Sequence, residues 1–111
     1  MSYSIVPIDK FKKEAKRLIK KYSSLKIELA VLGEELSKNP ETGTPLGNGA
    51  YKIRLAIKSK GKGKSGGARI ITYVVTDDKE VYLLTIYDKA ELDSVDDKTL
   101  KKVIAQINFN K

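Results

Sequence analysis

The first third of the chain has the apolar spacing of two amphipathic helices. After Asp9, a plausible N-cap, apolar residues recur every three or four positions at Phe11, Ala15, Leu18, Ile19 and Tyr22. After Ser23 or Ser24, the next possible caps, the stripe resumes at Leu25, Leu29, Leu32 and Leu36. Because so few residues separate the two stripes, we expect an antiparallel helical hairpin. The short alternating run at residues 3–7 ends at a proline and predicts an edge strand before the hairpin.

The second half changes to a period of two, which is typical of β-strands. Between residues 51 and 58 the larger apolar residues alternate with Lys52, Arg54, Ala56 and Lys58, so we predict a half-buried strand with a basic outer face. The β-branched run at 68–76 and the run at 80–87 predict a hairpin that turns at residues 77–79. The segment 39–49 holds two prolines and three glycines and predicts a loop.

A third amphipathic pattern closes the chain. Asp96 or Asp97 can cap a helix whose apolar residues are Leu100, Val103, Ile104 and Ile107. The element order is then β-α-α-β-β-β-α. We predict one α+β domain over residues 1–111, with an N-terminal strand and a helical hairpin packed on an antiparallel sheet of about four strands, and a C-terminal helix. The helices are expected on one face of the sheet.

Composition narrows the chemistry. The 111 residues contain neither cysteine nor histidine, which excludes thiolate catalysis, Ser-His-Asp triads and metal sites built on Cys or His. The formal charge is +8, and such basic chains commonly bind polyanions. No long apolar run predicts a signal peptide or a membrane span. We therefore expect a cytoplasmic protein without a membrane partner.

The segment 58–69, KSKGKGKSGGAR, is the most unusual stretch of the chain. Its Gly-Lys-Ser resembles the end of a nucleotide-binding P-loop, but Lys58 stands where the first glycine is needed, and a strand follows where a helix is needed. No acidic residue occurs from Thr42 to Thr76. The segment is therefore either a solvated tether or, as we favour, part of a basic surface for a polyanion.

Several short motifs together resemble the RelE/ParE superfamily, the toxins of type II toxin–antitoxin modules. They are Tyr51-Lys52-Ile53-Arg54-Leu55, the GKSGGAR of residues 63–69 with the IITY that follows, Tyr87-Asp88-Lys89 with Glu91, and the NPETGTPLG of residues 39–47. The resemblance covers nearly the whole chain. It is closest to the HigB-like branch of RelE-type toxins, whose members have a similar Gly- and Lys-rich loop before the arginine strand.

This resemblance implies a ribosome-dependent endoribonuclease that cuts mRNA. Such a reaction uses the 2′-OH of the RNA as nucleophile and needs a base, an acid and positive charge, but no metal ion and no cofactor. The resemblance also places Lys52, Arg54 and Arg69 on the cationic active-site surface of the family. Arg69 is the candidate clamp for the scissile phosphate, at a strand start that we expect to contribute little apolar burial; a cross-strand ion pair is the alternative.

Tyr87 and Lys89 end the last strand and complete the candidate catalytic group. Tyr87 either stacks on a base or orients the 2′-OH, unless it only packs on the core. The best-known RelE pattern has an arginine where this chain has Ala90, and a tyrosine where it has residues 93–97. Lysines expected to bind RNA backbone, or otherwise to form solvated surfaces, are Lys12, Lys16, Lys20, Lys58, Lys60, Lys62 and Lys64.

Three functions remain open from the sequence. The first is the mRNA endonuclease toxin, with a cognate antitoxin, mRNA on the ribosome and ribosomal RNA as partners. The second is a ParE-like inhibitor of DNA gyrase. The third is a non-catalytic basic RNA-binding domain of the same fold. A cationic cluster on the sheet favours the first over the second.

Overall fold

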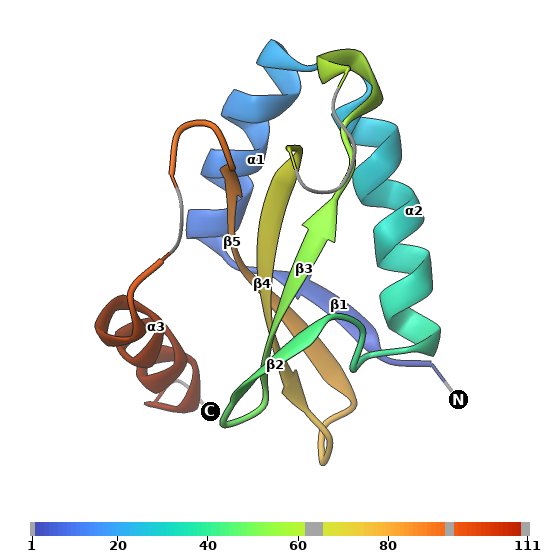
Figure 1. Ribbon diagram of the computed structural model, residues 1–111. Helices are drawn as coiled ribbons and strands as arrows, with labels where there is room; N and C mark the ends of the chain where they lie inside the picture. Colours follow the sequence, from blue (N-terminus) through green and yellow to red (C-terminus); the bar gives the residue numbers. More distant parts are fainter. Residues whose placement is uncertain (1, 62–65, 93–94, 110–111) are drawn as a thin grey trace.

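The residues that the structure describes form three α-helices, five strands and a 3-10 turn, and Figure 1 shows how they are arranged. The structure is a computed structural model that describes residues 2–61, 66–92 and 95–109. The elements are β1 (Ser4–Pro7), α1 (Asp9–Lys21), α2 (Leu25–Lys38), β2 (Thr44–Gly47), β3 (Ala50–Leu55), a 3-10 turn (Lys58–Lys60), β4 (Ala68–Val75), β5 (Glu80–Asp88) and α3 (Asp97–Phe109). The predicted α+β class and the C-terminal helix are confirmed. Within the described ranges no helix is long and apolar enough to cross a membrane.

The sheet has five strands in the order β1-β5-β4-β3-β2, one more than predicted. It is mixed, because β1 runs parallel to β5 while the other neighbours are antiparallel. The extra strand, β2, lies inside the segment that was predicted as a loop. Its sequence TPLG contains a proline and all four of its residues are exposed, so the sequence pattern did not indicate a strand. It pairs because Asn48 and its two neighbouring glycines adopt positive φ, which turns the chain back along β3.

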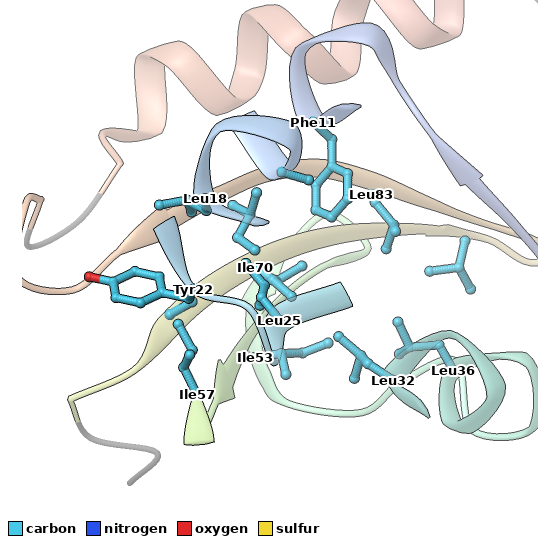
Figure 2. Close-up of a cluster of buried hydrophobic side chains, with 14 residues drawn as sticks. Phe11, Leu18, Tyr22, Leu25, Leu32, Leu36, Ile53, Ile57, Ile70 and Leu83 are labelled. Atoms are coloured by element: carbon cyan, nitrogen blue, oxygen red, sulfur yellow. The ribbon is translucent and has the colours of Figure 1, made fainter. Parts of the chain in front are cut away.

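The helical hairpin covers one face of the sheet and encloses the main core (Figure 2). Leu18, Leu25 and Leu36 are fully buried, as the apolar stripes predict. From the sheet they meet Ile70 and Ile86, which are also buried. The hairpin and sheet together therefore supply most of the apolar burial that stabilises the fold.

The third helix lies on the opposite face, so the expectation of helices on one face is wrong (Figure 1). Leu100 of α3 packs against Ile71 and Leu84 of the sheet. Neighbouring residues of a strand point to opposite faces, and both Ile70 and Ile71 are buried. The two consecutive isoleucines of β4 reflect this burial on two sides. The predicted cap of α3 is confirmed, because Asp96 Oδ1 accepts a hydrogen bond from the Thr99 N–H at 2.7 Å.

Candidate functional site

Strand register brings the predicted catalytic residues of the sheet together. Arg54 of β3 lies directly opposite Arg69 of β4, and Arg69 lies opposite Tyr87 of β5. Directly paired residues share a face of the sheet, and Lys52, two positions before Arg54, shares it too. Ile70, which follows Arg69 in β4, points to the other face, into the core beneath the helical hairpin. The opposite face thus bears what we call the sheet-face cluster: Lys52, Arg54, Arg69 and Tyr87.

Burial differs sharply within this cluster. Arg54 is exposed, whereas Arg69 is only 5% exposed. The expectation that Arg69 contributes little burial is therefore wrong, because the strand start is enclosed by its neighbours. Its Nη1 donates a hydrogen bond to the Ala68 carbonyl oxygen at 3.2 Å. A guanidinium held in this way has a restricted orientation, which suits the recognition of a phosphate more than general charge attraction.

The hydroxyl of Tyr87 is a buried polar group in need of a partner. The side chain is 6% exposed, and among the described residues its oxygen finds no hydrogen-bond partner. Burial raises the pKa of Tyr87, while the positive charge of Arg69 acts in the opposite direction. The phenol therefore stays protonated near neutral pH, so Tyr87 can donate a hydrogen bond but does not act as a phenolate base.

Lys60 makes a buried ion pair, a role that the sequence did not indicate. Its Nζ lies 2.5 Å from Asp88 Oδ1 and donates to the Gly66 carbonyl oxygen at 2.8 Å. The side chain is 12% exposed. Tyr22 donates its hydroxyl proton to Asp88 Oδ2, and the Ala90 N–H donates to Oδ1. Lys60 therefore connects the 3-10 turn after β3 to the end of β5 through this ion pair. Its ammonium group already has an anionic partner in Asp88.

Asp88 is a buried charged residue whose role the sequence did not indicate. Burial acts to raise its pKa, but hydrogen bonds from Lys60, Tyr22 and the Ala90 N–H outweigh burial and lower the pKa to about 2. All these partners are donors, so the carboxylate is engaged in holding the fold. In the parts of the chain that the structure describes, acidic groups do not gather in clusters suited to a metal ion. A lone aspartate in a strand pattern gave no signal of this network.

The other predicted RNA-binding lysines lie in separate places. Lys12, Lys16 and Lys20 are exposed along α1, across the sheet from the sheet-face cluster. Lys58 is exposed, and its backbone N–H donates to Glu28 Oε2 at 2.8 Å. Lys62 and Lys64 lie outside the described residues. The Lys89 N–H bonds to the Gly67 carbonyl oxygen, which places this residue where β5 meets the start of β4.

Comparison with known proteins identifies the fold. No family model matches the chain. The E. coli toxin RelE, as an arginine-to-alanine double mutant in the free state, superposes with a TM-score of 0.66 at 19% identity, over 96% of this chain and 99% of that one. The isolated E. coli RelE toxin superposes with a TM-score of 0.61 at 18% identity, over the same shares. The chain therefore has the fold of the RelE toxin.

Proposed function

We propose that this protein is the toxin of a type II toxin–antitoxin module and a ribosome-dependent endoribonuclease that cuts mRNA. One observation supports this most directly: Arg54 and Arg69 face each other on adjacent strands. Like charges in directly opposite positions of a sheet destabilise it. An anion between or beside the two guanidinium groups removes that repulsion, and an RNA phosphate is such an anion.

The chemistry proposed for the sheet-face cluster needs only the groups of this chain and the RNA. The 2′-OH attacks the adjacent phosphorus, its proton passes to a base, and the bond to the 5′-oxygen breaks as an acid protonates that oxygen. Arg69 and Arg54 stabilise the charge on the phosphorane. Tyr87 donates a hydrogen bond or stacks on a base, and Lys52 and Lys89 are the candidates for proton transfer. The products are a 2′,3′-cyclic phosphate and a 5′-hydroxyl.

The distribution of lysines supports a ribosomal setting. Lys12, Lys16 and Lys20 lie across the sheet from the cluster, so one face can hold mRNA while α1 contacts ribosomal RNA backbone. The partners we propose are mRNA on the ribosome, ribosomal RNA and a cognate antitoxin, all in the cytoplasm. The lysine- and glycine-rich segment 58–67 and Ala90 favour the HigB-like branch.

Two assays test this function against its alternatives. Induced expression without an antitoxin should stop protein synthesis first, which pulse labelling with amino acid and nucleoside precursors measures. Purified protein should cut mRNA on programmed ribosomes and not mRNA alone. If DNA synthesis stops first and mRNA stays intact, the gyrase reading replaces ours. Tight RNA binding without any cleavage on ribosomes identifies a non-catalytic binding domain.

A further inference from the structure

The 3-10 turn after β3 is fixed to the helical hairpin. Figure 1 shows this turn, the start of β4 and the end of β5 at the same end of the molecule. The Ser59 N–H donates to Ser24 Oγ at 2.9 Å, just before α2 begins. The Lys58 N–H donates to Glu28 of α2, so the turn is attached to the hairpin at two points. The turn is therefore a firm base from which Lys60 reaches the sheet.

From this base the Lys60 side chain holds the segment that leads into β4. Its Nζ donates to the Gly66 carbonyl oxygen and pairs with Asp88 at the end of β5. The Lys89 N–H donates to the Gly67 carbonyl oxygen at 3.1 Å. Gly67 also passes so close to β3 that a Cβ there would lie 2.1 Å from a carbonyl oxygen of that strand. The two residues before β4 are thus held by both neighbouring strands and by Lys60.

The same aspartate fixes the backbone after β5. Asp88 Oδ1 accepts a hydrogen bond from the Ala90 N–H at 2.9 Å, and the Asp88 carbonyl oxygen accepts one from the Glu91 N–H at 2.9 Å. The Glu91 carboxylate is in turn paired with Arg17 of α1, at 2.8 Å. The turn that carries Lys89 is therefore fastened to the Asp88 carboxylate and to the helical hairpin.

One ion pair thus supports two groups of the proposed active site from the opposite face of the sheet. Asp88 lies directly opposite Ala68, and Arg69 and Lys89 are the next residues along the two chains. The Asp88 side chain is fully buried and that of Lys60 is 12% exposed. Neither is placed to touch RNA, so both would act through the backbone that they hold.

We propose that Lys60 and Asp88 are positioning residues, which hold Arg69 and Lys89 at the spacing that RNA cleavage requires. The inference rests on the function proposed above. Firm support matters because a displacement of a reacting group by about 1 Å can slow a reaction about a hundredfold. Replacement of a buried ion pair by neutral groups often leaves stability unchanged. What the pair supplies here is the fixed direction of its hydrogen bonds to the two strand ends.

Single-turnover cleavage on programmed ribosomes tests this role in the full-length protein. Lys60→Met and Asp88→Asn should each slow cleavage at saturating protein by about tenfold to a hundredfold. Each leaves a buried charge without its partner and should lower the melting temperature. The double variant Lys60→Met/Asp88→Asn has no unpaired buried charge, so it should melt closer to the wild type and still cleave slowly. Lys60→Arg keeps a cationic donor and should recover most of the rate.

Tyr22→Phe is the matched control for stability. It removes another hydrogen bond to the same carboxylate of Asp88, so the melting temperature should again fall. The contacts of Lys60 with Asp88 and Gly66 remain in this variant. Its cleavage rate should therefore equal that of the wild type.

Salt dependence separates positioning from direct contact with RNA. Because Asp88 already neutralises Lys60, Lys60→Met should leave the slope of log K against log salt for ribosome binding unchanged. Lys58 is exposed, and Lys58→Met should reduce this slope by about 1.

The outcomes distinguish this role from the proposed function. A wild-type protein that cuts no RNA on ribosomes overturns the proposed function and this role with it. An active wild type together with normal cleavage by the double variant overturns this role alone. So does a rate loss in Tyr22→Phe as large as in Lys60→Met, because the rate then follows stability. An equal loss of salt dependence in Lys60→Met and Lys58→Met also overturns it, because Lys60 then contacts RNA itself.

Discussion

The two faces of the sheet use the same strands for different purposes. On the hairpin side, Ile70 and Ile86 are completely enclosed by α1 and α2. On the other side, α3 packs over Ile71 and Leu84, whereas Arg69 and Tyr87 occupy the next part of the face. The hairpin face therefore holds the main apolar core, and its buried charge, Asp88, is paired with Lys60 and Tyr22. The other face includes the buried hydroxyl of Tyr87, which has no partner among the described residues and reduces stability. Such a loss of stability is typical of a functional site, because its polar groups are arranged to bind a ligand and not to stabilise the fold.

The largest effect should come from the hairpin face. Ile70→Ala should lower the free energy of unfolding by about 2–5 kcal/mol, because it opens a cavity in the main core. Arg54 is exposed on the other face. Arg54→Ala should therefore change the free energy of unfolding by less than about 0.5 kcal/mol. Urea unfolding followed by circular dichroism measures both. Equal losses would mean that the two faces do not differ in the way described.

Arg69 tests whether the other face is catalytic. Arg69→Ala should slow mRNA cleavage about a hundredfold or more, the loss expected for one donor to the transition state. Arg69→Lys should recover only part, because a point charge replaces a bidentate fork. Single-turnover cleavage on programmed ribosomes measures the rates.

Because Arg69 is buried, Arg69→Ala also removes packing, and thermal melts must accompany the kinetics. Arg54→Ala is the matched control for folding, since Arg54 is exposed. It should lose cleavage activity while melting normally. Full activity in both folded variants would remove the two arginines from the site.

Asp88 tests a buried charge on the hairpin side. Its pKa of about 2 lies below the ordinary value of 3.8, so the charged form stabilises the fold. That stability is fully present above about pH 4 and is lost as pH falls from 3.8 towards 2, by about 2 kcal/mol. Asp88→Asn should remove this part of the acid dependence. Urea unfolding at several pH values compares the two proteins, and an unchanged acid dependence in Asp88→Asn would contradict the assignment.

Tyr87 separates stability from function most directly. Tyr87→Phe removes a buried hydroxyl that has no partner among the described residues, so the free protein should become more stable, by about 1 kcal/mol. Cleavage of RNA should nevertheless slow, because the hydrogen bond to the substrate is lost. A variant that is less stable and fully active would show that the hydroxyl serves the fold alone.

The smallest effect concerns the lysines of α1. Replacing Lys12, Lys16 and Lys20 with alanine should leave melting unchanged and flatten the salt dependence of ribosome binding. Three lost phosphate contacts reduce the slope of log K against log salt by about 2. Binding measured from low to moderate salt checks this slope. The control replaces Lys98, Lys101 and Lys102 of α3, and an equal flattening there would indicate only general charge attraction.

Much of the local structure follows from the sequence because its causes are local. The stripes of α1 and α2, the alternation in β3 and the Asp96 cap depend on spacing along one segment, and each is found in the structure. The absence of cysteine and histidine, together with the charge of +8, restricts the possible chemistry without any coordinates.

Tertiary structure alone decided what depends on distant segments. Strand β2 forms because β3 is available beside it, and α3 takes the second face because the hairpin occupies the first. Only strand register puts Arg54 opposite Arg69, and only folding buries Arg69. Lys60 looked like one more solvent-exposed lysine, yet it pairs with Asp88, 28 residues away in the chain. Burial and pairing at such separations depend on how whole elements pack, so no local pattern encodes them.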